Sequence, residues 1–370
     1  MFRDIRVIKY RGLCEVRLEE LGLVNVLVGD NNSGKTSVLE AIQLFADRDV
    51  LRNMISIARK RETPLNPLAR NRLQPFDAFL YSFPMSYDTF KEISVEADTD
   101  NYGYCGVGVK GNIYTDNLLE TEMTDAEMRR YSVMCDEDGM IRFFRGQYWF
   151  AENECYESDF IFRETQMKPE KIADKESHYL SAKRKSNIMY ISPLDIYTDK
   201  VLSASLYKGM LVEEKQRLID LMRLFDDRIL GIETAVQNDR PITMIEMDGM
   251  GLMPISVFGD GIKKVLTLAS AVIRMRGGVV LIDEFETGIH KRALKYVTEW
   301  MISVAKRYNV QFFITTHSSD AIAALVEAQG VDDNVISAYR LEHYKNEFYV
   351  KNFAGDDLRM LKNNQGLDIL

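Results

Sequence analysis

The apolar residues in the last third of the chain follow two periodicities in alternation. Strand-like apolar runs lie at 278–282 and 310–315, and residues at helical spacing follow Gly261, begin again near residue 290 and follow His317. Regular alternation of helix and strand is typical of a parallel sheet covered by helices. The pattern therefore predicts an α/β fold.

The middle of the chain loses the helical period. From residue 76 to 160, Tyr, Phe, Gly and β-branched residues dominate and predict short antiparallel strands at 91–98, 102–115 and 139–152. The polar and charged segment 160–186 predicts a variable insertion. We therefore expect an antiparallel part of the fold beside the parallel sheet.

Four further segments complete the pattern. Residues 187–193 predict a buried strand, and 206–233, with apolar residues at helical spacing, predict one or two helices that are too short for a long coiled coil. Residues 242–256 should form a hairpin that turns at Asp248-Gly249. Residues 335–370 should close the chain with a hairpin and a short helix.

A phosphate-binding loop is the clearest chemical signal. The residues GDNNSGKT at 29–36 fit the pattern G-x-x-x-x-G-K-[ST], directly after a strand-like run at 24–28. Backbone N–H groups of such a loop turn inward around a polyphosphate, and the following helix adds the positive end of its dipole. Lys35 should reach the β- and γ-phosphates, and the Thr36 hydroxyl should hold Mg²⁺. The candidate nucleotide-binding residues are Gly29, Asn31, Asn32, Ser33, Gly34, Lys35, Thr36 and Ser37.

Two acidic residues follow the strand expected at 278–282. Asp283 stands where a strand beside the phosphate-binding loop would supply a Mg²⁺ ligand, which makes it the Walker B acid. Glu284 follows it and could act as the general base for an attacking water. Acids after a strand are often only solvated, and a lone histidine is usually structural. The order of loop, acidic strand and His317 favours a catalytic site, in which His317 hydrogen-bonds the γ-phosphate and the water.

A second phosphate-binding shape lies at 256–273, where a glycine-flanked segment opens a helix. The phosphate-binding loop and the acidic strand already enclose the chain's own nucleotide. A second subunit should therefore use this helix start, so that two nucleotides are sandwiched between head-to-tail copies.

Composition limits the kinds of partner and the cellular compartment that we expect for the chain. The chain has 370 residues, a net charge of −9 and a pI of about 5.2, which argue against a surface that is basic throughout. Two basic segments, 51–74 and 181–187, are either solvated faces or contacts with nucleic acid or a partner. No apolar run approaches the roughly 20 residues that cross a bilayer, and the N-terminus lacks a signal core, so a cytoplasmic location is expected.

The cysteines support the same compartment. They lie far apart, with no C-x-x-C pair and no nearby histidine to complete a zinc site. We expect free thiols in a reducing cytoplasm. The four residues are Cys14, Cys105, Cys135 and Cys155.

Together these motifs resemble a known class of ATPase. The segments 8–42, 258–264, 281–290 and 314–322, in this order, resemble the ABC-class ATPases of the SMC and RecF group. They are most similar to the ATPase part of the OLD (overcoming lysogenization defect) family. This resemblance implies a P-loop NTPase fold with an ABC-type head: a mixed sheet flanked by helices, an antiparallel β subdomain and a short helical arm.

The resemblance also implies an ATP-dependent head-to-tail dimer in which Gly259, Asp260 and Gly261 form a signature loop that acts in trans. Two departures from the family pattern argue against fast hydrolysis and leave nucleotide binding intact. Family heads often carry Ser-Gly-Gly at the signature loop, and His290 replaces the usual aspartate of the D-loop. For the Q-loop glutamine, Gln147 is a weak candidate.

The motifs divide the chain into four parts. The expected parts are an N-terminal ATPase lobe with the P-loop (1–75), an antiparallel β subdomain (76–160), a variable insertion with a short helical arm (161–236) and a C-terminal ATPase lobe with the signature loop, Walker B acid and His switch (237–370).

The resemblance implies a switch that acts on another protein. OLD proteins usually continue into a Toprim nuclease domain, for which 331–370 leave no room. The chain is similar to stand-alone ATPase subunits of anti-phage systems of the PARIS type, which hold a separate Toprim-type nuclease and release it on infection. The expected function is an ATP-gated scaffold for such an effector, built from ATP-binding dimers or larger rings. The alternative is a DNA-repair or recombination ATPase of the RecF/SMC type that grips DNA. A small-molecule kinase is disfavoured because Glu284 and His317 suit attack by water.

Overall fold

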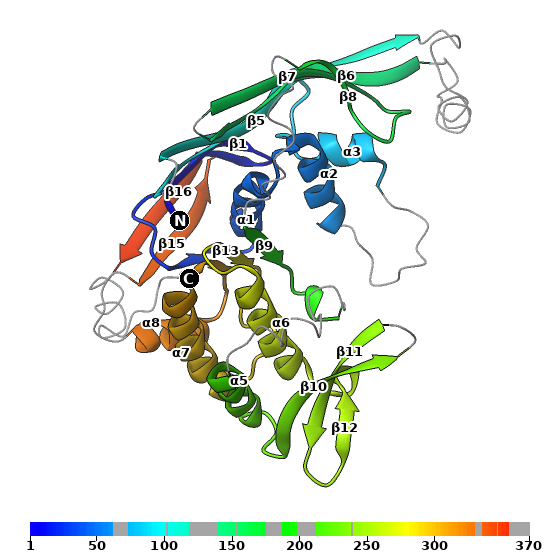
Figure 1. Cartoon of the computed structure of the whole chain (residues 1–370). Helices are drawn as coiled ribbons and strands as arrows, with labels where there is room; N and C mark the ends of the chain where they lie inside the picture. Colours follow the sequence, from blue (N-terminus) through cyan, green and yellow to red (C-terminus); the bar gives the residue numbers. More distant parts are fainter. Residues whose placement is uncertain are drawn as a thin grey trace.

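A computed structural model describes residues 1–61, 73–100, 103–117, 140–152, 154–174, 187–197, 212–237, 240–329, 335–345 and 347–354. These residues form sheets of seven, six and three strands with helices packed against them. In Figure 1 they stack as an antiparallel sheet, a layer of helices, the six-stranded sheet and a second layer of helices. None of the described helices is long and apolar enough to cross a membrane.

The six-stranded sheet has the strand order β16-β15-β3-β14-β13-β9. Five of its strands, β15, β3, β14, β13 and β9, run parallel, and the edge strand β16 pairs antiparallel with β15. The strand segments VVLI and VNVLV, apolar except for Asn25, are buried throughout, as expected for a parallel sheet between two helical layers. The bounds are β3 Val24–Val28, β9 Ile188–Ile191, β13 Val279–Ile282, β14 Gln311–Thr315, β15 Ile336–Tyr344 and β16 Glu347–Ala354.

Helices cover both faces of this sheet (Figure 1). One face packs against α1 and α2, and the other packs against α5, α6, α7 and α8. Successive strand residues alternate between the two cores: Val280 and Ile282 belong to one, whereas Val279 and Leu281 belong to the other. The bounds are α1 Lys35–Gln43, α2 Val50–Arg61, α3 Pro75–Leu80, α5 Val212–Arg223, α6 Asp260–Arg274, α7 Lys291–Tyr308 and α8 Ser319–Gln329.

The seven-stranded antiparallel sheet has the order β2-β1-β4-β5-β6-β7-β8. The N-terminal strands β1 and β2 therefore join strands from the middle of the chain. Its inner face packs on α3 through aromatic rings, with Phe79 5.1 Å from Phe144 and 5.6 Å from Phe162 between centroids. The bounds are β1 Phe2–Tyr10, β2 Leu13–Leu18, β4 Phe90–Thr99, β5 Gly103–Asn117, β6 Met140–Glu152, β7 Glu154–Arg163 and β8 Glu170–Asp174.

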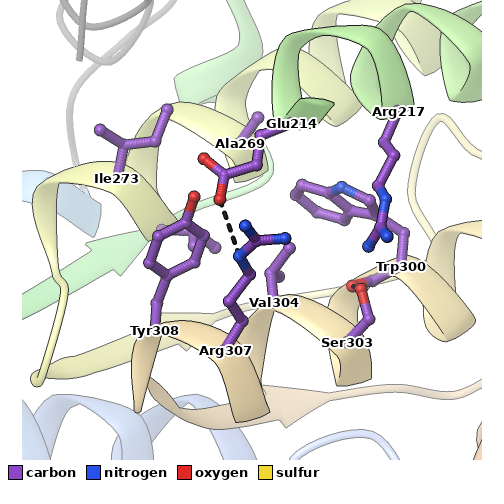
Figure 2. A pocket seen from close by; sticks show the side chains of 10 residues that line it. Glu214, Arg217, Ala269, Ile273, Trp300, Ser303, Val304, Arg307 and Tyr308 are labelled. Atoms are coloured by element: carbon purple, nitrogen blue, oxygen red, sulfur yellow. Dashed lines mark hydrogen bonds and ion pairs between the residues drawn. The ribbon is translucent and has the colours of Figure 1, made fainter. Parts of the chain in front are cut away.

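The third sheet pairs β10 Ile229–Gln237, β11 Arg240–Met247 and β12 Gly251–Pro254, all antiparallel. It leads into α6. The helix expected as part of a short arm, α5, does not project: Leu218, Ile219 and Met222 are buried in the core that α6 and α7 share. In Figure 2 the carboxylate of Glu214 on α5 meets the guanidinium of Arg307 on α7, with 2.9 Å between Oε1 and Nε.

Most of the predicted elements are confirmed. The alternating helices and strands after residue 260, the antiparallel strands at 90–152 and both hairpins are present, with Met247 opposite Gly251 at the Asp248-Gly249 turn. Cys14 and Cys105 are free thiols. The expected short helix at the C-terminus, Cys135, and most of the basic segment 181–187 lie outside the described residues.

Three expectations need correction. The segment 160–186, expected as an insertion, includes the end of β7, which pairs with β6, and all of β8, which pairs with β7 at the edge of the sheet. The end of 206–233 is strand β10 rather than helix, because it pairs with β11. Strand β9 forms at 187–193, but only Ile191 is fully buried because β9 is an edge strand. The proposed division into four parts stays a prediction.

The side chain of Gln311 connects the two large sheets. It is 1% exposed at the start of β14. Its Oε1 accepts the N–H of Phe2 on β1 at 2.9 Å, and its Nε2 donates to the carbonyl oxygens of Phe2 and Gly22 at 2.9 and 3.0 Å. One buried amide thus satisfies three backbone groups.

Replacing Gln311 with leucine should destabilise the protein. The variant leaves the three backbone groups without the partner that Gln311 supplies, so the free energy of unfolding should fall by roughly 2–4 kcal/mol. Urea unfolding measures this loss. The control is Gln216→Leu on the exposed face of α5, which should change stability by less than about 0.5 kcal/mol. Equal stability of Gln311→Leu and wild type would show that the amide is dispensable.

Candidate functional site

The phosphate-binding loop lies at the carboxyl end of β3, in the middle of the six-stranded sheet. Two of its positions accept only glycine. Gly29 has φ +134°, and a Cβ there would lie 2.4 Å from the carbonyl oxygen of Leu341. Gly34 has φ +94°, and a Cβ there would lie 2.6 Å from a methyl group of Leu13. The two glycines of the motif are therefore required by backbone geometry and by packing.

Lys35 lies inside the loop, 5% exposed. Its Nζ donates to the carbonyl oxygens of Gly29 and Asp30, both at 2.8 Å, and approaches Ser33 Oγ at 3.3 Å. Burial lowers the pKa of Lys35, and the carboxylates of Asp283, Asp30 and Glu286 act in the opposite direction. The ammonium group is thus held where the loop converges.

The remaining loop residues differ in exposure. Asn31 and Asn32 are exposed, and Asn32 has φ +67°, a left-handed conformation that asparagine tolerates better than most residues. Ser33 is buried, and its N–H donates to the carbonyl of Asp30 at 3.2 Å. Ser37 lies in the first turn of α1, where its Oγ accepts a hydrogen bond from Arg61.

The predicted metal ligands meet across the sheet. The hydroxyl of Thr36 at the start of α1 lies 3.0 and 3.2 Å from the two carboxylate oxygens of Asp283, which follows β13 and is 8% exposed. A hydroxyl and a carboxylate are hard oxygen donors of the kind that Mg²⁺ prefers, and Mg²⁺ takes its remaining ligands from phosphates and water. The residues present therefore fit a Mg²⁺–nucleotide complex.

Two hydroxyl groups that the sequence reading missed also hold Asp283. Thr315 Oγ1 on β14 donates to Oδ1 at 2.6 Å, and the hydroxyl of Tyr190 on β9 donates to Oδ2 at 3.1 Å. Burial raises the pKa of Tyr190, and the neighbouring Asp283 raises it further, so the phenol stays protonated as a donor. The strand at 187–193 was expected, but only the pairing of β9 with β13 places Tyr190 beside the acid.

The described end of the basic segment 51–74 lies against this site. Lys60 Nζ at the end of α2 lies 5.5 Å from the ring centroid of Tyr190. Arg61 donates to Ser37 Oγ at 3.2 Å and pairs with Glu40 of α1, with 2.5 Å between Nε and Oε1. Lys60 and Arg61 therefore make contacts within the protein, while 62–72 lie outside the described residues.

The buried carboxylate of Glu40 on α1 forms ion pairs with two arginines. It is 3% exposed, and Arg11 Nε also contacts its carboxylate, at 3.0 Å. Burial raises the pKa of Glu40, whereas Arg11 and Arg61 lower it. Two arginines from separate segments thus compensate one buried carboxylate in the helix that follows the P-loop.

The two candidate hydrolytic residues lie at neighbouring strand ends. Glu284 has φ +48°, and its exposed carboxylate accepts a hydrogen bond from Thr287 Oγ1 at 3.0 Å. His317 follows β14 with an exposed imidazole. Its backbone N–H donates to Glu286 Oε1 at 2.9 Å, and Glu286 is a third acid of this loop that the sequence reading did not single out. The catalytic roles of Glu284 and His317 stay predictions.

The signature loop begins α6. Gly259 is the N-cap, and a Cβ there would meet no atom within 4 Å. Asp260 Oδ2 accepts the hydroxyl of Tyr197 at 2.6 Å, and Lys263 Nζ lies 3.7 Å from its other oxygen. The Asp260 carboxylate is therefore paired within its own chain.

Gly261 has a packing role. A Cβ at this position would lie 2.4 Å from the ring of Phe225 and 3.0 Å from the carbonyl oxygen of Gly288. The signature helix therefore packs closely on the loop after the Walker B acid within one chain. Its use by the nucleotide of a second copy stays a prediction.

A buried lysine connects the same two segments. Lys264 on α6 is fully buried, and its Nζ donates to the carbonyl oxygen of Glu284 at 3.2 Å. Burial lowers the pKa of Lys264 to about 8, although the carboxylates of Glu286 and Glu284 act in the opposite direction.

Two further sequence candidates lie elsewhere. His290 is the N-cap of α7, where its Nδ1 accepts the N–H of Arg292 at 3.3 Å. Gln147 lies within β6, opposite Lys110 and Asp159, in regular strand rather than in a loop. The proposed Q-loop role of Gln147 therefore has no support from its position.

The solved structures that are similar to this chain include head domains of SMC proteins. The SMC head domain from Thermotoga maritima is 11% identical, with a TM-score of 0.46 and coverage of 95% of this chain and 98% of that chain. The Smc head domain with an extended coiled coil bound to the C-terminal domain of ScpA, derived from Pyrococcus furiosus, is 12% identical, with a TM-score of 0.49 and coverage of 98% of each chain.

Two curated relatives are similar in sequence. An "ATP/GTP phosphatase" of Helicobacter pylori is 22% identical over 387 residues, which cover 95% of this chain and 92% of that protein. An uncharacterized protein of Methanocaldococcus jannaschii is 30% identical over 112 residues, which cover 27% of this chain and 98% of that protein.

Two families match the sequence. Residues 162–323 match a family described as "AAA domain, putative AbiEii toxin, Type IV TA system". Residues 1–229, more than half of the 370-residue chain, match the AAA ATPase domain family. That stretch includes the phosphate-binding loop, the strand that carries Tyr190 and the helix that carries Arg61. The protein therefore belongs to the AAA ATPase domain family.

Proposed function

We propose that this protein is a cytoplasmic, Mg²⁺-dependent ATPase. The observation that carries the proposal is the 3.0 Å approach of the Thr36 hydroxyl to the Asp283 carboxylate, beside the buried ammonium of Lys35. The P-loop and Lys35 bind the triphosphate, and Thr36 and Asp283 hold the metal. Bound Mg²⁺ supplies charge neutralisation on the phosphates. Glu284 takes the proton from water, and His317 contacts the γ-phosphate.

Association of two copies is the second part of the proposal. The start of α6 offers free N–H groups and the positive end of a helix dipole at Gly259. Gly259 is exposed, beside a pocket of about 480 Å³ with a methionine-rich lining. Head-to-tail copies would place Gly259, Asp260 and Gly261 of one against the γ-phosphate of the other. Hydrolysis should be slow because the loop lacks a serine hydroxyl.

The third part of the proposal is an ATP-gated scaffold for a separate effector, a Toprim-type nuclease, in anti-phage defence. The match of 162–323 to a family named for a toxin–antitoxin system is compatible with this setting. Against the alternative of a DNA-gripping repair ATPase, Arg59 contacts the carbonyl oxygen of Leu73, and Arg61 and Lys60 contact the ATP site. Co-purification with the neighbouring gene product, with and without ATP, separates the two: a nuclease supports the scaffold, and a recombination protein supports repair.

Lys35→Ala should strongly weaken ATP binding. The variant removes the ammonium that pairs with the β- and γ-phosphates, so affinity should fall by roughly 10- to 100-fold or more. Titration with ATP measures the dissociation constant. Lys351→Ala, at an exposed position of β16, is the control and should bind like wild type. Wild-type affinity in Lys35→Ala would show that the P-loop does not bind nucleotide.

Tyr190→Phe should lower the affinity of the site for Mg²⁺ without changing the affinity for ATP. The variant removes one of the two hydroxyl donors at Asp283 Oδ2 and leaves that of Thr36, and loss of such an outer partner typically costs about 10-fold or more in metal affinity. The Mg²⁺ concentration at half-maximal turnover should rise accordingly. Tyr339→Phe is the matched control, because it also removes a buried tyrosine hydrogen bond, to the carbonyl oxygen of Glu19. Identical Mg²⁺ dependence of all three proteins would exclude a role for Tyr190 at the metal.

Gly259→Glu should prevent ATP-dependent association. The side chain has space at this position and places a carboxylate against the partner's γ-phosphate, so turnover should fall roughly 10-fold or more. ATP binding to the single chain should be unchanged. Gly261→Glu would be a poor test because it would collide with Phe225.

The matched control for this prediction is Gly12→Glu, which adds the same charge at another position with space around it. Mass in solution with ATP, together with turnover, is measured for each protein. Normal assembly and turnover in Gly259→Glu would rule out the trans arrangement.

A further inference from the structure

Glu286 has a carboxylate oxygen that the described residues leave without a partner. It lies in the loop between β13 and α7, and its Oε1 accepts the backbone N–H of His317 at 2.9 Å. Its Oε2 is buried and makes no hydrogen bond to any described residue. A buried carboxylate oxygen without a partner is costly, so such an atom usually marks a missing ligand or water.

Two lysines that feel the charge of Glu286 indicate where it lies in the site. Its carboxylate acts on the pKa of both Lys35 in the P-loop and Lys264 on the signature helix, raising each. It is the largest such influence on Lys264. Because these Coulombic effects fall off with distance, Glu286 lies near both the lysine of the P-loop and the buried lysine of α6.

Glu284, the other acid of this loop, has a different environment. Its carboxylate is exposed and contacts Thr287 in its own turn, and its left-handed backbone directs it away from the regular strand path. The carboxylates that act on Lys35 are those of Asp283, Asp30 and Glu286. The phosphate side of the loop therefore carries a second acid besides the metal ligand.

We infer that Glu286 is a catalytic residue of ATP hydrolysis, whose Oε2 accepts a hydrogen bond from the attacking water and directs it at the γ-phosphorus. This inference rests on the proposed ATPase function. The water oxygen bonds to phosphorus while the bond from phosphorus to the β–γ bridging oxygen breaks, and ADP keeps that electron pair. The proton released goes to Glu284. Glu286 takes no proton and orients the water through its remaining hydrogen.

The backbone contact alone does not require a carboxylate. An amide oxygen would accept the N–H of His317 equally well, and a carboxylate near a triphosphate adds like-charge repulsion. Lys264, buried without an aqueous shell, and Lys35 offset that repulsion. The arrangement is typical of charges placed in advance for a step that follows binding.

The substitution Glu286→Gln distinguishes a catalytic role of Glu286 from a structural one. The amide oxygen keeps the bond to His317, so the melting temperature should match wild type. Turnover should fall by roughly 10- to 100-fold because an amide orients water less strongly. ATP should bind several-fold more tightly because a negative charge near the phosphates is gone. Glu286→Asp, one methylene shorter with its charge retained, should also turn over slowly but without tighter ATP binding.

Three measurements decide the outcome: turnover, ATP dissociation constant and melting temperature. Glu284→Gln is measured beside them and should lose turnover with near-normal ATP affinity, and Glu342→Gln, an exposed residue paired with Arg340, is the control. Wild-type turnover in Glu286→Gln overturns the inference and leaves the ATPase function standing. Parallel loss of ATP binding and thermal stability would assign Glu286 a structural role, which also overturns it. A wild-type protein that binds ATP without turnover would overturn the ATPase function itself.

Discussion

The buried carboxylate of Asp283 organises the site. Three hydroxyl groups donate to it from three separate segments: Thr36 after β3, Thr315 on β14 and Tyr190 on β9. Each segment can reach it only because the strands lie side by side in parallel, with their carboxyl ends together. The strand order of the sheet thus sets the geometry of the candidate metal site, which is the general behaviour of ligand sites in open α/β sheets.

The candidate nucleotide site and the proposed contact between copies share one short loop. Residues 283–290 carry the candidate metal ligand and the acids, and at Gly288 they pack against the start of α6. Lys264 of α6 reaches back to the carbonyl oxygen of Glu284. A change at the signature loop therefore cannot leave the acids of the same chain unaffected, because close-packed contacts transmit displacement.

The sequence was sufficient for the parts of the molecule that depend on local pattern. The P-loop glycines, Thr36 and Asp283 follow from short motifs between a strand and a helix, and the alternating C-terminal elements follow from periodicity. Residues that act through distant pairing could not be predicted in this way. In the sequence, Tyr190 is one residue of a short strand, and only the pairing of β9 with β13 places it beside Asp283. Gly261 must be glycine because the ring of Phe225, which is distant in sequence, leaves no room for a Cβ.

The position of β3 has a consequence for synthesis of the chain. The P-loop strand emerges early, yet its two neighbours in the sheet, β14 and β15, end at residues 315 and 344. Until those residues leave the ribosome, β3 has two open edges, and unpaired apolar strand edges promote association between chains. The pairings are also distant in sequence, which slows folding. A nascent chain therefore has its nucleotide motif long before it has a nucleotide site, and it needs protection during that interval.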